Sequence, residues 1–374
     1  MEMRRRTLYQ VVSLLVIAMM LLVACGQAAP TEPTAAPGEP TSPPAPPPTT
    51  APAVEKVYMA MVMHQAIPYT AQIREGWDAF CAEHADDLTC DYAVPDKVDP
   101  ERQIAFFEDF ISKGAQGIVT NCVPAEVWIE PVKAARAAGV LVNSVDVTCL
   151  TDSEWNVQVG PDFYSQGKQF ATEFFDALAE KGKGSGQIVV GYCAPGYTSQ
   201  EARMKAMLEE CTARGTYECV GNLDTGHNVD LNYGFWETAT LQYDKAVAFV
   251  GTCAFDGPNL LKLKALREAP WEIGTWDLEP ETLEGLKSGQ LLAAVGNNPF
   301  LNAYLAARLL YEHLKSGEPL YVAGLVDTPS EIVTYKNATE FYAREADPAA
   351  KATFYKGIAD SFVDLDAVII PSPY

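Results

Sequence analysis

The feature that most constrains this chain is a regular alternation of strand-like and helix-like segments. From residue 57 to residue 335, short apolar runs rich in β-branched residues alternate with longer amphipathic stretches. This alternation is typical of parallel sheets whose faces are covered by helices. The chain from this point on has roughly 320 residues, which exceeds the usual size of one hydrophobic core. We therefore expect an α/β fold with two lobes.

The alternation divides into two series of segments. The first has predicted strands at 57–63, 89–94, 117–121, 140–145 and 156–160, and helices at 69–83, 100–112 and 125–138. The second begins with a helix at 163–181 and has strands at 187–192, 218–223, 246–251, 271–276 and 291–295, with helices at 199–214, at 231–243 and from Pro280. A helix at 301–315 and a strand at 330–335 follow. Two such series in tandem predict two similar lobes, each built on a parallel sheet.

Residues 1–24 have the features of an export signal. Arg4, Arg5 and Arg6 precede an apolar run at 11–23 that is too short to favour a stable membrane span. The run ends in Leu-Val-Ala-Cys25, which resembles a bacterial lipobox and implies cleavage before Cys25 and lipidation of its thiol. The alternative is an N-terminal transmembrane anchor, which the length of the run disfavours. We expect a mature chain held to the membrane by lipid.

Residues 25–54 separate this signal from the part of the chain that alternates. They consist almost wholly of Ala, Pro, Thr, Glu and Ser and have no apolar periodicity. Prolines favour extended conformations, so the segment is predicted to be a tether between the membrane and the folded part. A Pro-rich ligand for a protein partner is the alternative, which composition alone supports.

The chain is strongly acidic, with a formal net charge of −22 at pH 7. This charge argues against binding to nucleic acid and to anionic lipid head groups. It does not identify a small ligand, because the local field in a cleft can differ from the net charge of the protein.

Polar residues follow two neighbouring strands of the second series. The strand at 271–276 is followed by Asp277, and the strand at 291–295 leads to Asn297, Asn298 and Pro299. In open α/β sheets ligands bind outside the carboxyl ends of the strands, so these residues are expected to face a pocket. In order and spacing the stretch resembles the late segment of periplasmic sugar-binding proteins of the ribose-binding type.

The resemblance covers about residues 57–336 and implies a type I periplasmic binding protein fold. That fold has two Rossmann-like lobes with parallel sheets, joined by a three-strand hinge. With breaks near Gly160, Asn297 and Ala323, the implied lobes are 55–159 plus 298–323 and 160–297 plus 324–340. Residues 341–374 have no counterpart in the family, and we expect a helix at 348–359 docked on one lobe.

In the first lobe the resemblance places ligand-binding residues after two strands. Tyr69 matches the first of the aromatic residues that the family holds against the sugar, and His64 and Gln65 lie where they would supply hydrogen bonds. Asp146 matches a binding aspartate, whereas Val147 stands where the family has an arginine, so one guanidinium donor is missing. The alternatives are structural: Tyr69 would start a helix, and Asp146 would cap one or lie in a turn.

In the second lobe Arg203 matches the family's ligand arginine, whose fork of donors can hold two hydroxyl groups. The capping-box spacing of Thr198 and Glu201 fixes the helix start and hence the direction of Arg203. Thr252 stands where relatives carry an asparagine, and Asp256 is an alternative for reaching the cleft. The other predicted ligand residues are Asp277, Asn297 and Asn228. Trp236 and Trp276 are further candidates that equally suit the core.

Besides Cys25 the chain has eight cysteines, an even number that favours disulfides in an exported protein over metal sites or free thiols. Two pairs each flank a helix end and the next strand, one pair in each series. Two further pairs follow strands that are expected to be neighbours, again one pair in each sheet. We predict the four bridges Cys81–Cys90, Cys122–Cys149, Cys193–Cys253 and Cys211–Cys219.

The sequence contains no HExxH, GxSxG or CxxC motif, and its four histidines lack metal-ligand spacing. We expect a binder with no cofactor, no metal and no catalytic residue. The resemblance implies a monomeric, extracytoplasmic lipoprotein, in the periplasm or on the cell surface, that captures a monosaccharide or related polyol by lobe closure and delivers it to an ABC permease. Alternatives are a sensory receptor for a sugar or a furanosyl signal, a nucleoside-binding lipoprotein and a periplasmic carbohydrate enzyme.

Overall fold

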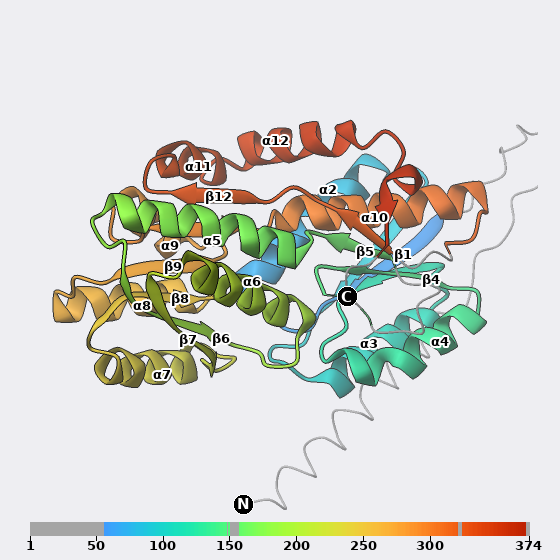
Figure 1. Ribbon diagram of the computed structural model, residues 1–374. Coiled ribbons are helices and arrows are strands. Elements are labelled where there is room, and N and C mark those ends of the chain that lie inside the picture. The colour runs from blue at the N-terminus through green and yellow to red at the C-terminus, as the bar shows by residue number, and fades with distance from the viewer. Residues whose placement is uncertain (1–55, 148, 150–156, 321–323, 372–374) are drawn as a thin grey trace, which may run out of the picture. The chain divides into compact units, whose positions relative to one another are not determined.

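Two mainly parallel sheets, each covered by helices, make up the fold (Figure 1). The computed structural model describes residues 56–147, 149, 157–320 and 324–371. Within these residues one sheet has seven strands in the order β13-β11-β5-β4-β3-β1-β2, and the other has six in the order β12-β10-β9-β8-β6-β7. The predicted α/β fold with two lobes is confirmed. The predicted signal peptide, Cys25 and the tether lie outside the described residues.

The sheet of the first lobe has helices on both faces. Its strands β1 (Val57–Val62), β2 (Leu88–Ala93), β3 (Gly117–Thr120), β4 (Leu141–Val145) and β5 (Val157–Gly160) are parallel, and its helices are α2 (Pro68–Glu83), α3 (Pro100–Ser112), η1 (Ala125–Trp128), α4 (Ile129–Ala137) and α10 (Pro299–Ser316). Successive side chains of a strand point to opposite faces. Met59 and Met61 of β1 therefore join the core under α2 and α10, and Ala60 and Val62 join the core under α3 and α4.

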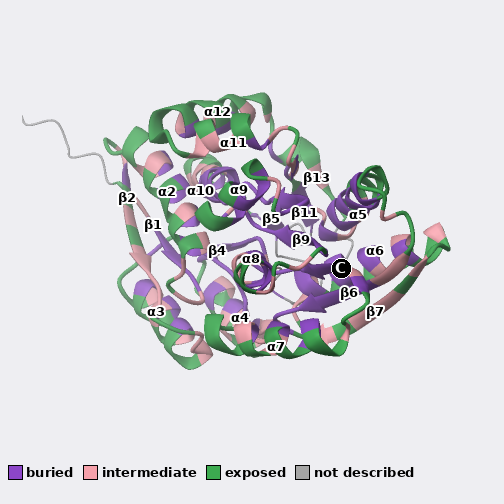
Figure 2. Cartoon of the chain, turned by 90° about the vertical axis from the view of Figure 1, so that its left-hand side faces the viewer, coloured by how far each residue is buried: buried purple, intermediate pink, exposed green. Residues whose placement is uncertain are grey.

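The second lobe repeats this plan. Its strands are β6 (Gly186–Tyr192), β7 (Tyr217–Asp224), β8 (Ala246–Gly251), β9 (Glu272–Trp276) and β10 (Ala293–Gly296), and its helices are α5 (Phe163–Glu180), α6 (Thr198–Arg214), α7 (Val229–Gln242), α8 (Asp256–Arg267) and α9 (Pro280–Lys287). Val250 of β8 packs in the core with α5 and α6, whereas Phe249 packs on the opposite face with α7 and α8. Both faces of β6, β8, β9 and β10 are mainly buried, whereas the edge strand β7 is partly exposed. The other exposed residues lie mainly on the outer sides of the helices (Figure 2).

The chain passes between the two sheets three times before residue 335. It leaves the first sheet after β5, returns through α10, and leaves again between β11 (Gly324–Asp327) and β12 (Glu331–Thr334). β11 is parallel to β5, and β12 is antiparallel to β10. The third crossing therefore lies at residues 328–330, a few residues later than the predicted break near Ala323.

The C-terminal extension contacts both lobes. Its first residues complete α11 (Ala338–Glu345), in which Phe341 and Tyr342 pack against the core of the second lobe. The helix α12 (Pro348–Ser361) contributes Tyr355 and Ala359 to the core of the first lobe, as predicted for a helix at 348–359. After the short η2 (Asp366–Val368), β13 (Ile369–Ile370) pairs antiparallel with β11.

Among the described elements the sequence reasoning missed five, α8, α11, β11, η2 and β13. α8 opens with Asp256, Gly257 and Pro258, which are turn-forming types, but a proline in the first turn of a helix costs no hydrogen bond. The strands β11 and β13 have four and two residues, too few for a recognisable pattern, and they depend on pairing with other segments. No helix in the described part of the chain is long and apolar enough to span a membrane.

Candidate functional site

A cavity of about 110 Å³ lies between the two lobes. A cavity that holds one water measures about 10–15 Å³, so there is room for a small solute. Its wall includes residues that follow β1 and β4 of the first lobe and β6, β8, β9 and β10 of the second. Seven of the nine predicted ligand residues line it: His64, Gln65, Tyr69, Asp146, Arg203, Asp277 and Asn297.

Asp146 directly follows β4 and is 4% exposed. Its φ is +61°, a left-handed conformation that turns the chain sharply at the strand end. Oδ1 accepts a hydrogen bond of 2.8 Å from Asn302 Nδ2, and Oδ2 accepts one of 2.9 Å from the Tyr69 hydroxyl. Burial raises the pKa of Asp146 to about 6, although these hydrogen bonds and the charge of Arg203 act in the opposite direction.

Asp277 holds the equivalent position in the second lobe, directly after β9. It is 8% exposed and has a φ of +69°. Oδ1 accepts a hydrogen bond of 2.5 Å from Asn297 Nδ2. Burial raises its pKa to about 6 as well, while Arg203 and Asn297 favour the charged form.

A buried amide network at the hinge supports the two carboxylates. Asn297 Oδ1 accepts from Gln166 Nε2 at 2.8 Å, and Gln166 Oε1 accepts from Trp276 Nε1 at 2.9 Å. Asn302 donates both to Asp146 and to the backbone oxygen of Asn297, and its Oδ1 accepts from Thr328 at 2.7 Å. The network joins both lobes and fixes the rotamers of the residues that face the cavity.

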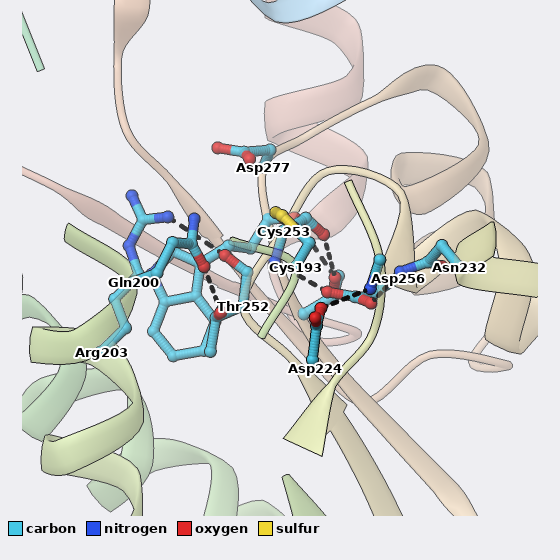
Figure 3. The surroundings of a disulfide bond; sticks show 12 residues. Cys193, Gln200, Arg203, Asp224, Asn232, Thr252, Cys253, Asp256 and Asp277 are labelled. Atoms are coloured by element: carbon cyan, nitrogen blue, oxygen red, sulfur yellow. Dashed lines mark hydrogen bonds between the residues drawn. A yellow bond between two sulfur atoms is a disulfide. The ribbon is translucent and has the colours of Figure 1, made fainter. Parts of the chain in front are cut away.

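Arg203 of α6 is held between two aromatic rings. Its guanidinium carbon lies 4.8 Å from the ring centre of Phe163 and 5.7 Å from that of Trp276. Nη1 donates to the backbone oxygen of Thr252 at 3.1 Å, and the guanidinium lies beside Gln200 (Figure 3). Stacking on aromatic faces holds the planar fork of donors in one orientation. The planar cation is thus oriented for polar groups in the cavity.

His64 is a neutral hydrogen-bond donor in this site. Asn121 Oδ1 accepts from Gln103 Nε2 at 3.2 Å, so Asn121 Nδ2 donates to His64 Nδ1 at 2.6 Å. The imidazole proton then resides on Nε2. Burial lowers the pKa of His64 to about 4, which keeps the ring uncharged at neutral pH.

Two of the predicted ligand residues do not line the cavity. Asn228 caps α7, since its Oδ1 accepts from the backbone N–H groups of Asp230 and Leu231. Thr252 is fully buried, and its hydroxyl hydrogen-bonds the Gln200 side chain. Both side chains make their hydrogen bonds within the protein, so the structure does not bring these two predicted residues to the cavity wall.

The further candidates Asp256, Trp236 and Trp276 are also structural. Asp256 is fully buried and accepts from Asn232, Trp236 and the backbone N–H of Cys253 (Figure 3). Trp236 and Trp276 are core residues of the second lobe, although Trp276 supports Arg203 from behind.

Several cavity residues were not predicted from the sequence as ligand residues. They include the aromatic and imidazole side chains Phe163, Tyr197, Phe255 and His227, together with Gln200. Phe163 and Gln200 were assigned only to helices, and their positions near the helix starts, at the cavity end of the sheet, could have identified them. Aromatic faces complement the C–H surfaces of a sugar ring.

The structure contains all four predicted disulfides, Cys81–Cys90, Cys122–Cys149, Cys193–Cys253 and Cys211–Cys219. Cys193 and Cys253 line the cavity, and their bridge ties the loop after β6 to the loop after β8 (Figure 3). Cys122 and Cys149 instead belong to the core of the first lobe. In the described part of the chain no group of His, Cys, Asp and Glu is arranged to hold a metal ion.

Two lobes with a cavity between them, lined by aromatic side chains and a few polar ones, are an arrangement typical of solute-binding proteins. The model of the family described as periplasmic binding protein domain matches residues 59–319. The chain belongs to this family, and its architecture is the type I periplasmic binding fold. The members of the family are binding proteins, so this chain is a binding protein and not an enzyme.

Similar proteins include the xylose/arabinose-binding protein XylF of Sulfolobus acidocaldarius, 21% identical over 268 residues, or 67% of this chain. The chain matches 65% of the length of that relative, less than two thirds. An ABC transporter solute-binding protein of Burkholderia graminis, solved with D-arabinose, superposes with a TM-score of 0.69 at 19% identity, over 76% of this chain and 98% of the other. A carbohydrate transporter solute-binding protein of Agrobacterium radiobacter, also solved with D-arabinose, superposes with a TM-score of 0.68 at 18% identity, over 79% of this chain and 98% of the other.

Proposed function

We propose that this protein captures a monosaccharide or a closely related polyol in the cavity between its lobes. The observation that carries the proposal is the placement of two buried carboxylates, one from each lobe, with a stacked guanidinium among the residues that line the same cavity. Carboxylates accept hydrogen bonds from sugar hydroxyls, and Arg203 and His64 donate to the hydroxyl oxygens. The aromatic walls suit the apolar faces of the ring.

The relatives favour the same solute class. XylF is named for binding xylose and arabinose, and the two solved structures contain D-arabinose. The pocket of this chain has one guanidinium, with Val147 next to Asp146 in its lining. Val147 cannot hydrogen-bond a hydroxyl, so we expect a preference among sugars that reflects the loss of one donor on the first-lobe side.

Capture would proceed by closure of the two lobes. Ligand contacts from both lobes exist together only in the closed arrangement, so the ligand shifts the population toward it. We further propose that the chain is a lipoprotein attached through Cys25, that it acts as a monomer outside the cytoplasm, and that the closed form delivers its solute to an ABC permease.

A thermal-shift screen tests the solute class. The full chain is heated with pentoses, hexoses, inositols, nucleosides or amino acids. A ligand at 100 times its dissociation constant adds about 2.7 kcal/mol to the free energy of unfolding and raises the Tm by a few degrees. We expect a sugar or polyol to give this shift, and Asp277→Ala and Arg203→Ala to abolish it.

The matched control is Asp109→Asn, which alters an exposed carboxylate on α3 that is ion-paired with Lys113. This variant should keep the full shift. Binding of nucleosides or amino acids without any sugar would contradict the assignment of the cavity to sugars. Deletion of the gene followed by growth on the solute would separate transport from a sensory role.

A further inference from the structure

A second chamber of about 180 Å³ adjoins the main cavity. The two spaces share Ile67, Tyr69, Ala254 and Phe255 in their linings, so they lie on either side of these side chains. Apolar atoms of Val229 and Pro258 form part of the chamber wall. A substituent on a sugar in the main cavity would have to pass between these side chains to enter the chamber.

The chamber contains a buried carboxylate that the protein does not satisfy. Glu279 is 6% exposed, and its Oε1 is buried without a hydrogen-bond partner among the described residues. Burial, with the nearby charge of Asp277, raises its pKa to about 7. A buried acceptor without a donor costs about 1–3 kcal/mol, so such groups are completed by an ordered water, an ion or a ligand group.

The charges of the two linings are not balanced. The main cavity has two carboxylates, Asp146 and Asp277, against the guanidinium of Arg203. The chamber lining has two carboxylates, Glu279 and Glu281, and one ammonium group, Lys262. Glu281 and Lys262 are exposed, whereas Glu279 is buried. Exposed charges are screened by water, so the buried charges set the local field, and these are mainly negative.

We propose that the chamber is a subsite for an ammonium-bearing substituent of the captured sugar, with Glu279 as its hydrogen-bond acceptor. The proposal rests on the proposed function, because it places the sugar itself in the main cavity. An ammonium group supplies the missing donor and a compensating charge, and charge-assisted hydrogen bonds are the strong ones. The solute would then be an amino-substituted sugar rather than a neutral monosaccharide.

Matched glycosides test the proposal. Aminoethyl and hydroxyethyl glycosides of arabinose, glucose and galactose are titrated calorimetrically into the full chain, along with the free sugars. We expect the aminoethyl compound of the preferred sugar to bind about tenfold more tightly than its hydroxyethyl partner, the gain of one charge-assisted hydrogen bond. Glu279→Gln should abolish this difference and leave the affinity for the free sugar unchanged.

Glu281→Gln is the control, since it removes an exposed carboxylate of the same lining and should keep the tenfold difference. Equal affinity of the two glycosides for the wild-type protein, with the free sugar bound, would overturn the subsite and leave the proposed function standing. A preference that survives Glu279→Gln would overturn it as well. If no sugar or glycoside binds, the proposed function fails. The wild-type comparison decides alone if Glu279→Gln does not fold.

Discussion

The two lobes present the same residue type in the same local structure. Asp146 and Asp277 each follow a parallel strand, and both have a left-handed backbone, with φ values of +61° and +69°. Each backbone N–H donates to the neighbouring strand, at 3.0 Å to Val159 and at 2.7 Å to Val295. Each carboxylate accepts from an asparagine at the hinge. The repeated βαβ plan has thus produced two equivalent acceptors on opposite walls of one cavity.

The two carboxylates differ in how many hydrogen bonds they accept from other residues of the protein. Both oxygens of Asp146 accept from protein donors, Asn302 and Tyr69. Among the described residues Asp277 has one such donor, Asn297, on Oδ1. We infer that Asp146 mainly orients Tyr69 and joins the lobes through Asn302, whereas Asp277 has the greater capacity to accept from a ligand.

The largest expected effect on stability concerns the two disulfides that follow sheet strands, one in each lobe. Replacing both Cys193 and Cys253 by Ser opens a bridge with a sequence separation of 60 and should lower the free energy of unfolding by about 4 kcal/mol. Since this bridge lines the cavity, ligand affinity should fall as well. Denaturant unfolding and calorimetry measure the two quantities.

The matched change in the first lobe is the Cys122→Ser, Cys149→Ser pair, whose separation is 27. This double variant should lower the free energy of unfolding by about 3.5 kcal/mol. It should reduce ligand affinity much less than the Cys193/Cys253 variant does, because these cysteines lie in the core. An equal loss of affinity in both double variants would break the distinction between the lobes.

The next effect concerns pH. Both aspartates have folded-state pKa values near 6, above the ordinary value of 3.8, so the folded protein binds more protons than the unfolded chain between these values. Their ionisation therefore lowers stability as pH rises from about 4 to 6. When the pH is raised from 4 to 7, the free energy of unfolding of Asp277→Asn and of Asp146→Asn should each rise by about 3 kcal/mol relative to that of the wild type. Urea unfolding at both pH values gives the difference.

A pH-independent difference for either variant would show that the carboxylate concerned ionises normally. Asp109→Asn serves as the control, because its carboxylate is exposed and no such gain is expected.

Ligand affinity sharpens the comparison directly. With the sugar found in the screen, Asp277→Asn should weaken binding about 100-fold, the cost of one or two charge-assisted hydrogen bonds to the ligand. Asp146→Asn should weaken it about tenfold, since its oxygens are shared with Tyr69 and Asn302. Isothermal titration at pH 7 measures both. A larger loss for Asp146→Asn would reverse the assignment of roles.

A smaller effect is expected at Arg203. Arg203→Lys keeps the charge but loses the planar fork that stacks between Phe163 and Trp276. We expect affinity to fall about fivefold, within the range of a cation–π contact. Lys205→Arg, on the same helix and beside Tyr164, is a neutral control.

The sequence predicted the parallel-sheet architecture because apolar runs and helix starts are local signals. It also predicted Asp277 and Asn297 as cavity residues, since strand ends face the same edge of a sheet, and the family resemblance added Asp146. Asn302 and Gln166 could not be found in this way. They lie inside helices, and their roles depend on contacts between segments far apart in the chain.

Thr252 and Asn228 show the opposite limit. Each stands at a strand end or loop that suggests ligand contact, but the structure uses their side chains internally, with Gln200 and with the start of α7. Which polar side chain faces the cavity is decided by rotamers and neighbours that no local pattern encodes. Glu279 was overlooked because it is buried although the next two residues, Pro280 and Glu281, are exposed, so the local pattern gives no sign of its burial.

The most direct test of the account is a crystal structure of the protein with the sugar that the thermal-shift screen identifies. The account predicts the sugar between the lobes, within hydrogen-bonding distance of Asp277 and the guanidinium of Arg203 on one side and of the His64–Asp146 wall on the other. A sugar bound outside this cavity, or held by one lobe alone without contact to Asp277, would contradict it.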